Sequence, residues 1–221
     1  MGFRYIVEHM EEDENTPRSL PEWVVLEYQH MRALAGASST VHFTHLSQAS
    51  TDSLTALFSA SPQPSSSESG LAAAYAHTTP ILPFLSSMQI PLERVCLLDP
   101  KAPQEISPAD AAEFDCFLLG GMLGDDPPRD RTSELRALGF PSRHLGPVQM
   151  TTDTALGVTK KVVEDKIPLS EIPYVDFPTI RFSAKESVEM PFRYISQDGS
   201  PLLPPGMKDL LKRDLDRGFE F

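Results

Sequence analysis

The N-terminal part of the chain alternates between short apolar runs and one amphipathic stretch. Residues 4–8 (RYIVE) are mostly apolar and β-branched, which predicts a short buried strand. Residues 24–35 carry apolar side chains at helical spacing, residues 19–22 (SLPE) have the spacing of a capping box, and Gly36 is a typical helix end. Residues 41–46 predict a second strand. This order of strand, helix and strand predicts a parallel sheet.

The same alternation returns in the second half of the chain, after a stretch from about residue 50 to residue 90 in which no clear pattern is seen. The predicted elements there are strands at 94–98, 116–119 and 143–145, a short helix after Ser107, and helices at 132–138 and 150–163. Together these elements predict an α/β domain over residues 1–165, with a parallel sheet and helices on both of its faces.

Two segments differ in composition from this domain. Residues 59–70 (SASPQPSSSESG) are rich in serine and proline and predict an exposed insertion. Residues 166–221 contain seven prolines between Pro168 and Pro205, a density that disfavours helices and central strands. We therefore expect a C-terminal extension that packs on the domain and ends in a short helix.

The charge of the chain narrows the class of partner. The sequence has 19 Lys and Arg against 31 Asp and Glu, a formal net charge of −12. Such a chain repels nucleic acid, whereas a cationic partner is attracted to it. The sequence contains neither a long apolar run typical of a membrane span nor a secretory signal, and its two cysteines exclude a disulfide scaffold. We expect a cytoplasmic protein.

The most informative motif is the segment that follows the predicted strand at 116–119. It reads GGMLGDDPPRDR, so two glycines come directly after a strand and a rigid, highly charged loop follows them. In open parallel sheets, ligands bind at the carboxyl ends of the strands. Two glycines alone also fit an ordinary tight turn, but the charged loop favours a ligand site. The spacing matches neither a dinucleotide fingerprint nor a phosphate-binding loop.

Two weaker candidates would share that edge of the sheet. Residues 145–155 combine a strand end, a glycine and a hydroxyl-rich helix start, which fits a pocket of backbone donors or plain helix capping. Glu8 and His9 end the first strand, although His9 also fits an ordinary polar position.

The remaining reactive side chains are interpreted as structural. His42 and His45 have a ligand-like separation, but no carboxylate or cysteine cluster accompanies them, so we interpret them as surface residues and expect no metal. Cys96 and Cys116 lie in apolar runs and are interpreted as core thiols.

Taken together, these motifs resemble the fungal SPOUT-type protein arginine methyltransferase family. The resemblance covers most of the chain except about residues 37–90. It is carried by YIVEHMEE (5–12), EWVVLEY (22–28), RVCLLDP (94–100), GGMLGDDPPRDRTSEL (120–135), QMTTDTA (149–155), EMPFRY (189–194) and PLLPPGMKDLLKRD (201–214).

The resemblance implies a fold, a cofactor and a substrate. The fold would be the α/β SPOUT fold with a C-terminal trefoil knot, in a monomer whose C-terminal extension packs on the domain. S-adenosylmethionine would bind against three loops, and the substrate would be the third protein of the small ribosomal subunit, monomethylated on an arginine. By match to the family, the cofactor-binding residues would be Leu98, Pro100, Gly120, Gly121, Leu123, Gly124, Asp125, Leu145, Gly146, Met150, Thr151 and Thr152.

The chemistry of arginine methylation indicates a carboxylate in the site. A guanidinium group is a poor nucleophile, and a paired carboxylate would orient it, localise its charge and accept its proton. Asp125 and Glu8 are the first candidates for this role because of their positions at the expected ligand edge, with Asp130 and Asp126 after them. Asp126 and Asp130 also fit a role in which they pair with neighbouring arginines and hold the loop closed.

Two other functions remain open at this stage. An RNA methyltransferase of the same fold would need a local basic face, for which Arg129, Arg131, Arg136 and Arg143 are the candidates. A non-catalytic acidic module that binds a ribosomal protein would use the glycine loops only as turns.

Overall fold

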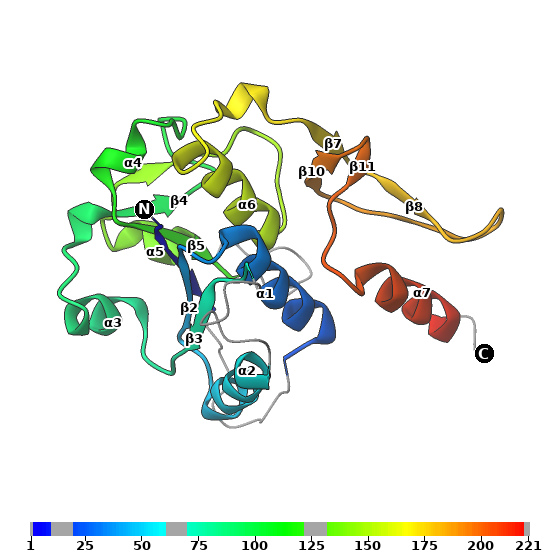
Figure 1. Cartoon of the computed structure of the whole chain (residues 1–221), viewed down its shortest axis with the longest axis horizontal. Coiled ribbons are helices and arrows are strands. Elements are labelled where there is room, and N and C mark those ends of the chain that lie inside the picture. The colour runs from blue at the N-terminus through cyan, green and yellow to red at the C-terminus, as the bar shows by residue number, and fades with distance from the viewer. Residues whose placement is uncertain (1, 10–19, 61–69, 122–131, 219–221) are drawn as a thin grey trace.

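The structure is a computed structural model that describes residues 2–9, 20–60, 70–121 and 132–218. Its centre is a sheet of six parallel strands in the order β3-β2-β1-β5-β4-β6 (Figure 1). The strands are β1 (Arg4–Glu8), β2 (Thr40–Thr44), β3 (Ala73–Ala76), β4 (Val95–Leu98), β5 (Cys116–Gly120) and β6 (Ser142–Arg143).

Helices cover both faces of this sheet, as the sequence predicts. The helices are α1 (Glu22–Ala35), α2 (Gln48–Ala60), α3 (Ile81–Ser87), α4 (Asp110–Glu113), α5 (Thr132–Ala137) and α6 (Thr152–Val163). Apolar side chains of α1, α2 and α6 form one buried cluster with alternate strand residues such as Tyr5 and Val7. Side chains of α3 and α5 form a second cluster with Ile6 on the opposite face. Alternation along β1 thus supplies both halves of the core.

The start of α1 differs from the predicted capping box. The helix begins at Glu22 directly after Pro21, and Pro21 provides no side-chain hydrogen bond to the helix. Glu22 is therefore the first residue of the helix, whereas a capping box with Ser19 would make it the third. Ser19 lies outside the described residues. The predicted end is confirmed, because Gly36 has φ +75° and its N–H donates to Arg32 O at 3.2 Å.

Three elements lie in the stretch where the sequence shows no clear pattern: α2, β3 and α3. Helix α2 extends to Ala60, so it includes the first two residues of the predicted insertion at 59–70. Helix α6 begins at Thr152, two residues later than predicted, with Thr151 as its N-cap.

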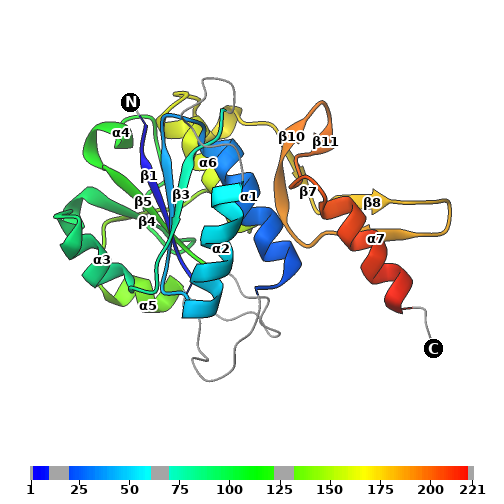
Figure 2. The same ribbon diagram turned by 60° about the horizontal axis from the view of Figure 1, so that its bottom comes forward.

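The C-terminal residues form two small antiparallel sheets and a helix. They contain β7 (Tyr174–Asp176), β8 (Thr179–Arg181), β9 (Ser187–Glu189), β10 (Arg193–Gln197), β11 (Ser200–Pro201) and α7 (Met207–Gly218). The sheets have the orders β11-β10-β7 and β8-β9. In Figure 2 these elements lie beyond α1 and α6 as seen from the main sheet.

Among the described residues, both β10 and α7 contact the main domain. Ile195 of β10 belongs to the core cluster of α1 and α6. Its side chain lies 3.1 Å from the position that a Cβ on Gly157 would occupy, so a glycine there lets β10 approach α6 closely. Helix α7 contacts α1, where Arg213 pairs with Glu22. The division at residue 165 and the trefoil knot stay predictions. In the described part of the chain, no helix is long and apolar enough to cross a membrane.

Candidate active site

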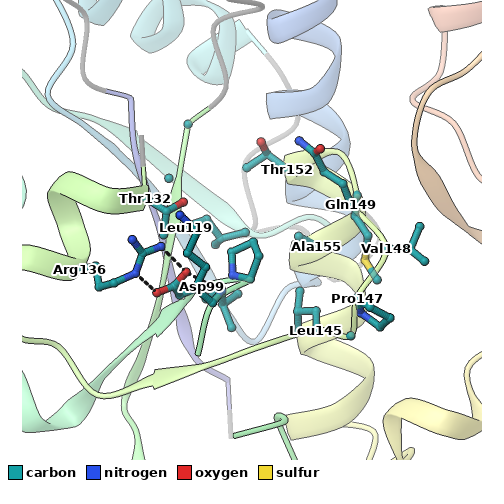
Figure 3. A pocket seen from close by; sticks show the side chains of 17 residues that line it. Asp99, Leu119, Thr132, Arg136, Leu145, Pro147, Val148, Gln149, Thr152 and Ala155 are labelled. Carbon is teal, nitrogen blue, oxygen red and sulfur yellow. Dashed lines mark hydrogen bonds and ion pairs between the residues drawn. The ribbon is translucent and has the colours of Figure 1, made fainter. Parts of the chain in front are cut away.

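A cavity of about 480 Å³ opens at the carboxyl ends of β4 and β5 (Figure 3). Three segments form its wall: the loop after β4, the end of β5 with the facing side of α5, and the segment that leads into α6. The lining residues are Leu98, Asp99, Pro100, Lys101, Leu119, Gly120, Gly121, Thr132, Arg136, Leu145, Gly146, Pro147, Val148, Gln149, Met150, Thr152 and Ala155. Its volume and largely apolar lining are typical of a small-molecule site.

Glycine at position 121 is required by the close approach of β1 and β5. Its N–H donates to Glu8 O at 2.8 Å. A Cβ on Gly121 would lie 3.0 Å from Cα of His9 and 3.1 Å from Glu8 O, and both of these are backbone atoms. The strands would have to separate to admit a side chain, so this position of the cavity wall requires glycine.

One ion pair forms the polar side of the cavity. Arg136 of α5 binds Asp99 with two parallel hydrogen bonds, from Nε to Oδ2 and from Nη2 to Oδ1, the latter at 2.7 Å. The Asp99 side chain is 1% exposed and that of Arg136 is 34% exposed. Burial alone would raise the pKa of Asp99, but the hydrogen bonds from Arg136 and from the N–H of Lys101 outweigh it and lower that pKa below its usual value. Asp99 therefore stays ionised, and the pair fixes α5 to the loop after β4.

The segment before α6 is held by the C-terminal elements. Met150 pairs with Arg193 in an isolated β-bridge, and the N–H of Arg193 donates to Gln149 O at 2.8 Å. The Arg193 guanidinium in turn pairs with Asp176 and lies 4.5 Å from the ring centre of Tyr174. The third wall of the cavity therefore depends on residues that are more than 20 positions further along the chain.

The structure brings together eight of the twelve predicted cofactor-binding residues in this cavity. Thr151 is the exception among the described ones: it does not line the cavity, and its hydroxyl donates to Thr154 Oγ1 at 2.8 Å as part of the start of α6. Leu123, Gly124 and Asp125 lie outside the described residues. The eight that line the cavity are Leu98, Pro100, Gly120, Gly121, Leu145, Gly146, Met150 and Thr152.

Glu8 lies at the predicted edge, but its carboxylate is engaged on the α3 side of the sheet. It accepts hydrogen bonds from the Thr44 hydroxyl and from the N–H of Ile81 at 3.2 Å, and it lies 3.1 Å from His45 Nδ1. Burial raises the pKa of Glu8, and these contacts only partly offset that effect. Glu8 is not among the residues that line the cavity. Asp130 and Asp126, the other candidate carboxylates, lie outside the described residues.

The interpretation of His42 as a surface residue is wrong. His42 is 6% exposed, and its ring stacks on those of Tyr75 and His77. It occupies an alternate position of β2 that faces α3, where a neutral imidazole packs like an aromatic side chain. His45 is half-buried beside Glu8. Both cysteines are free and buried, as predicted.

Two of the four arginines considered for a basic face are neutralised within the fold. Arg136 is paired with Asp99, and Arg143 is 8% exposed and pairs with both Asp110 and Glu113. Arg129 and Arg131 lie outside the described residues. Neither of these two described arginines is therefore free to contribute to the basic face that an RNA substrate needs.

Comparison with known proteins agrees with this geometry. A family model described as "Protein arginine N-methyltransferase SFM1-like" matches residues 4–218. The chain belongs to this family. It is 39% identical to protein arginine N-methyltransferase SFM1 of Saccharomyces cerevisiae over 96% of this chain and 95% of the yeast protein.

Solved structures of the yeast protein share the fold. The chain matches yeast SFM1 complexed with SAM at a TM-score of 0.77, with 38% identity, 97% of this chain covered and 92% of that chain. It matches the complex with SAH at a TM-score of 0.74, with 38% identity and 94% of each chain covered. The expected SPOUT fold and the expected family of S-adenosylmethionine-dependent protein arginine methyltransferases are confirmed.

Sequence reasoning missed the charged residues of the cavity. Asp99, Lys101 and Arg136 lie beside predicted positions, but no pattern within the sequence indicates that residues 99 and 136 form a pair. Gln149 and Val148 were part of the hydroxyl-rich segment that the sequence singled out, without an assigned role. The sequence did contain one indication that Asp99 belongs to the site, because it directly follows a buried strand.

Proposed function

We propose that this protein transfers a methyl group from S-adenosylmethionine to an arginine of a basic protein of the small ribosomal subunit, and that the product is ω-N-monomethylarginine. The observation that carries the proposal is the cavity at the carboxyl ends of β4 and β5, in a chain that belongs to the SFM1-like family. The yeast relative that supplies the match was solved with SAM and with SAH.

The residues of the cavity fit this cofactor. Leu98, Leu119, Leu145 and Met150 provide apolar walls for a flat base and a thioether-like chain. Gly120 and Gly121 carry no side chain, so the polar edges of a nucleoside can approach their backbone closely. When bound, the cofactor supplies an electrophilic methyl group on a positively charged sulfur, which leaves with the bonding electron pair.

The protein must align the acceptor and take up its proton. Alignment of two reacting groups is worth about 7–11 kcal/mol in favourable cases. A carboxylate beside the guanidinium would orient one nitrogen toward the methyl group and accept the proton that this nitrogen loses. Asp125 stays our first candidate for this role. Glu8 is a weaker one, because its carboxylate is already engaged by Thr44 and the N–H of Ile81.

The charge of the chain favours a protein substrate over RNA. The net charge is −12, and Arg136 and Arg143 pair with carboxylates of the protein. Ribosomal proteins are basic, so they are attracted to this surface, whereas a phosphate backbone is repelled. We place the reaction in the cytoplasm, with the protein acting as a monomer; the two free cysteines suit a reducing compartment.

The test has two stages. Calorimetric titration with S-adenosylhomocysteine measures cofactor-site binding, and labelled-methyl transfer is then measured with isolated small-subunit ribosomal proteins and with ribosomal RNA. Label recovered as monomethylarginine after hydrolysis of a basic protein is the expected result. Label in RNA would keep the fold and replace the substrate. Failure to bind S-adenosylhomocysteine, with retained binding to a ribosomal protein, would favour the acidic binding module.

A further inference from the structure

Four polar side chains are buried together between α1, α6 and β10, outside the residues that line the cavity. They are Glu27 and His30 on α1, Asp153 on α6, and Tyr194 on β10. Their exposed fractions are 7%, 6%, 1% and 1% respectively. His30 Nδ1 lies 2.7 Å from Asp153 Oδ2, so the cluster combines one imidazole with two carboxyl groups.

The hydrogen-bonding capacity of this cluster is only partly used within the described residues. Asp153 Oδ1 and the Tyr194 hydroxyl are buried and make no hydrogen bond there. Glu27 has no hydrogen bond or ion pair to any side chain of the described segments. Burial, and then the charge of Asp153, raise the pKa of Glu27 well above its usual value. Burial and the two carboxylates likewise raise the pKa of Tyr194, which keeps its hydroxyl neutral. Buried carboxylates at this density are costly unless a cation joins them.

The cluster adjoins the cavity. Asp153 directly follows Thr152, which lines the cavity, and both lie in the first turn of α6. Tyr194 directly follows Arg193, whose N–H holds the Gln149 carbonyl in the cavity wall. Helix α1 contacts α6, and Figure 3 shows it running past the start of that helix. Asp153 and Tyr194 are therefore direct chain neighbours of residues that form or hold the cavity wall.

We propose that Glu27 and Asp153, with the Tyr194 hydroxyl, bind the guanidinium group of the arginine that is methylated. This site rests on the proposed function and names its acceptor subsite. A guanidinium is planar and carries five N–H donors, so it can satisfy two carboxylates and a hydroxyl at once. A lysine ammonium is compact and lacks this fork, so the site selects arginine over lysine.

A purely structural role explains the four residues less well. The His30–Asp153 contact can clamp α1 to α6, but Glu27 makes no contact that a clamp would need. A buried carboxylate without a partner destabilises a fold, so it is retained for a reason other than stability. Replacement of Glu27 by its amide therefore separates binding from folding.

The test compares Glu27→Gln with Glu22→Gln, a control on the same helix whose side chain is 55% exposed and pairs with Arg213. Each full-length variant is measured for thermal unfolding, for affinity to S-adenosylhomocysteine, and for kcat and KM with the purified ribosomal protein that the wild type labels. Glu27→Gln is expected to keep its midpoint and its affinity, and to lose about tenfold or more in kcat/KM. Glu27→Asp, which keeps the charge, should recover part of that loss.

Three results would contradict the acceptor site. Activity of Glu27→Gln within about twofold of Glu22→Gln would overturn the acceptor site and leave the proposed function intact. If Glu27→Gln does not fold, Tyr194→Phe gives the same test, since it removes one buried hydroxyl and keeps the ring; unchanged kcat/KM there would overturn the site. A wild type that binds S-adenosylhomocysteine but labels no protein would overturn the proposed function itself, and the acceptor site with it.

Discussion

The Asp99–Arg136 pair gives the sharpest test of how the cavity is held together. Replacement Arg136→Met keeps much of the side-chain volume and removes the charge, which leaves the Asp99 carboxylate buried with only the N–H of Lys101 at 2.9 Å. Breaking a fully buried ion pair costs about 3–5 kcal/mol. Because the Arg136 side chain is 34% exposed, solvent screens part of that interaction, and we expect a loss of about 2–3 kcal/mol in the free energy of unfolding.

The dependence of this loss on pH follows from the direction of the pKa shift. In the wild type, Arg136 and the N–H of Lys101 hold the pKa of Asp99 below its usual value of 3.8 despite burial. The stability that this lowered pKa provides is present above pH about 4 and is lost as the pH falls through the folded-state pKa. In Arg136→Met, burial dominates and raises the pKa of Asp99 instead. The destabilisation should then be largest near pH 7 and smaller near pH 5, where a buried carboxyl can take up a proton.

The assay is urea unfolding of the wild type and the variant at both pH values. Asp99→Asn in the Arg136→Met background removes the buried charge and should recover part of the stability. Arg94→Met is the matched control, because Arg94 and Asp115 form a bidentate pair at the surface, and we expect little change there. Equal destabilisation by Arg136→Met at both pH values would refute the argument that an uncompensated carboxylate is its cause.

Three further perturbations test other parts of the fold. Gly121→Ala should destabilise the protein by about 1–3 kcal/mol in urea unfolding, because the new Cβ meets backbone atoms of β1 and the residue after it. It should also weaken S-adenosylhomocysteine binding in calorimetry, and unchanged values in both assays would show that β1 and β5 separate freely. Burial raises the pKa of Cys96 to about 12 and that of Cys116 to about 11, so neither thiol should react with an alkylating reagent at pH about 8 until the protein unfolds; rapid labelling of the native protein would contradict this. Burial and then the charge of His77 lower the pKa of His42 to about 4. Between pH about 6.5 and 4 only the unfolded chain takes up this proton, so the free energy of unfolding should decrease as the pH falls through that range. His42→Phe should flatten this dependence, and an unaltered pH profile in the variant would exclude His42 as its cause.

The parallel sheet could be predicted because its central strands are continuous apolar runs. β1, β4 and β5 are buried on both faces, which leaves a strong signal in the sequence. The stretch from α2 to α3 carries a weak signal for physical reasons. Helix α2 buries only Ser50, Leu54 and Phe58, β3 is made of AAYA, and α3 is a seven-residue helix that contains a proline. Tertiary contacts with the edge of the sheet, rather than local pattern, define these elements.

The parts of the candidate site that depend on backbone geometry could be predicted from the sequence. The parts that depend on ion pairs between distant side chains could not. Glycines after a strand indicated Gly120 and Gly121 directly. The pair of Asp99 and Arg136 forms only because the loop after β4 and the start of α5 meet at one edge of the sheet, and the sequence does not encode that meeting locally. For the same reason Arg136 was considered for a basic surface, whereas the fold commits it to a carboxylate.

In the proposed reaction, the acidic charge of the chain and the buried carboxylates would act on a basic substrate at different ranges. Arg94, Arg136, Arg143 and Arg193 all pair with carboxylates of the protein itself, so these four cations contribute little to the field that a partner meets. The remaining excess of acidic residues attracts a basic protein over several ångströms, but this attraction is screened by salt and does not distinguish lysine from arginine. Selection of arginine requires a desolvated site with the geometry of a guanidinium, because only there do hydrogen-bond directions outweigh charge. An enzyme that modifies one arginine among many lysines therefore needs both a negative surface to collect its substrate and a buried acidic site to choose the side chain.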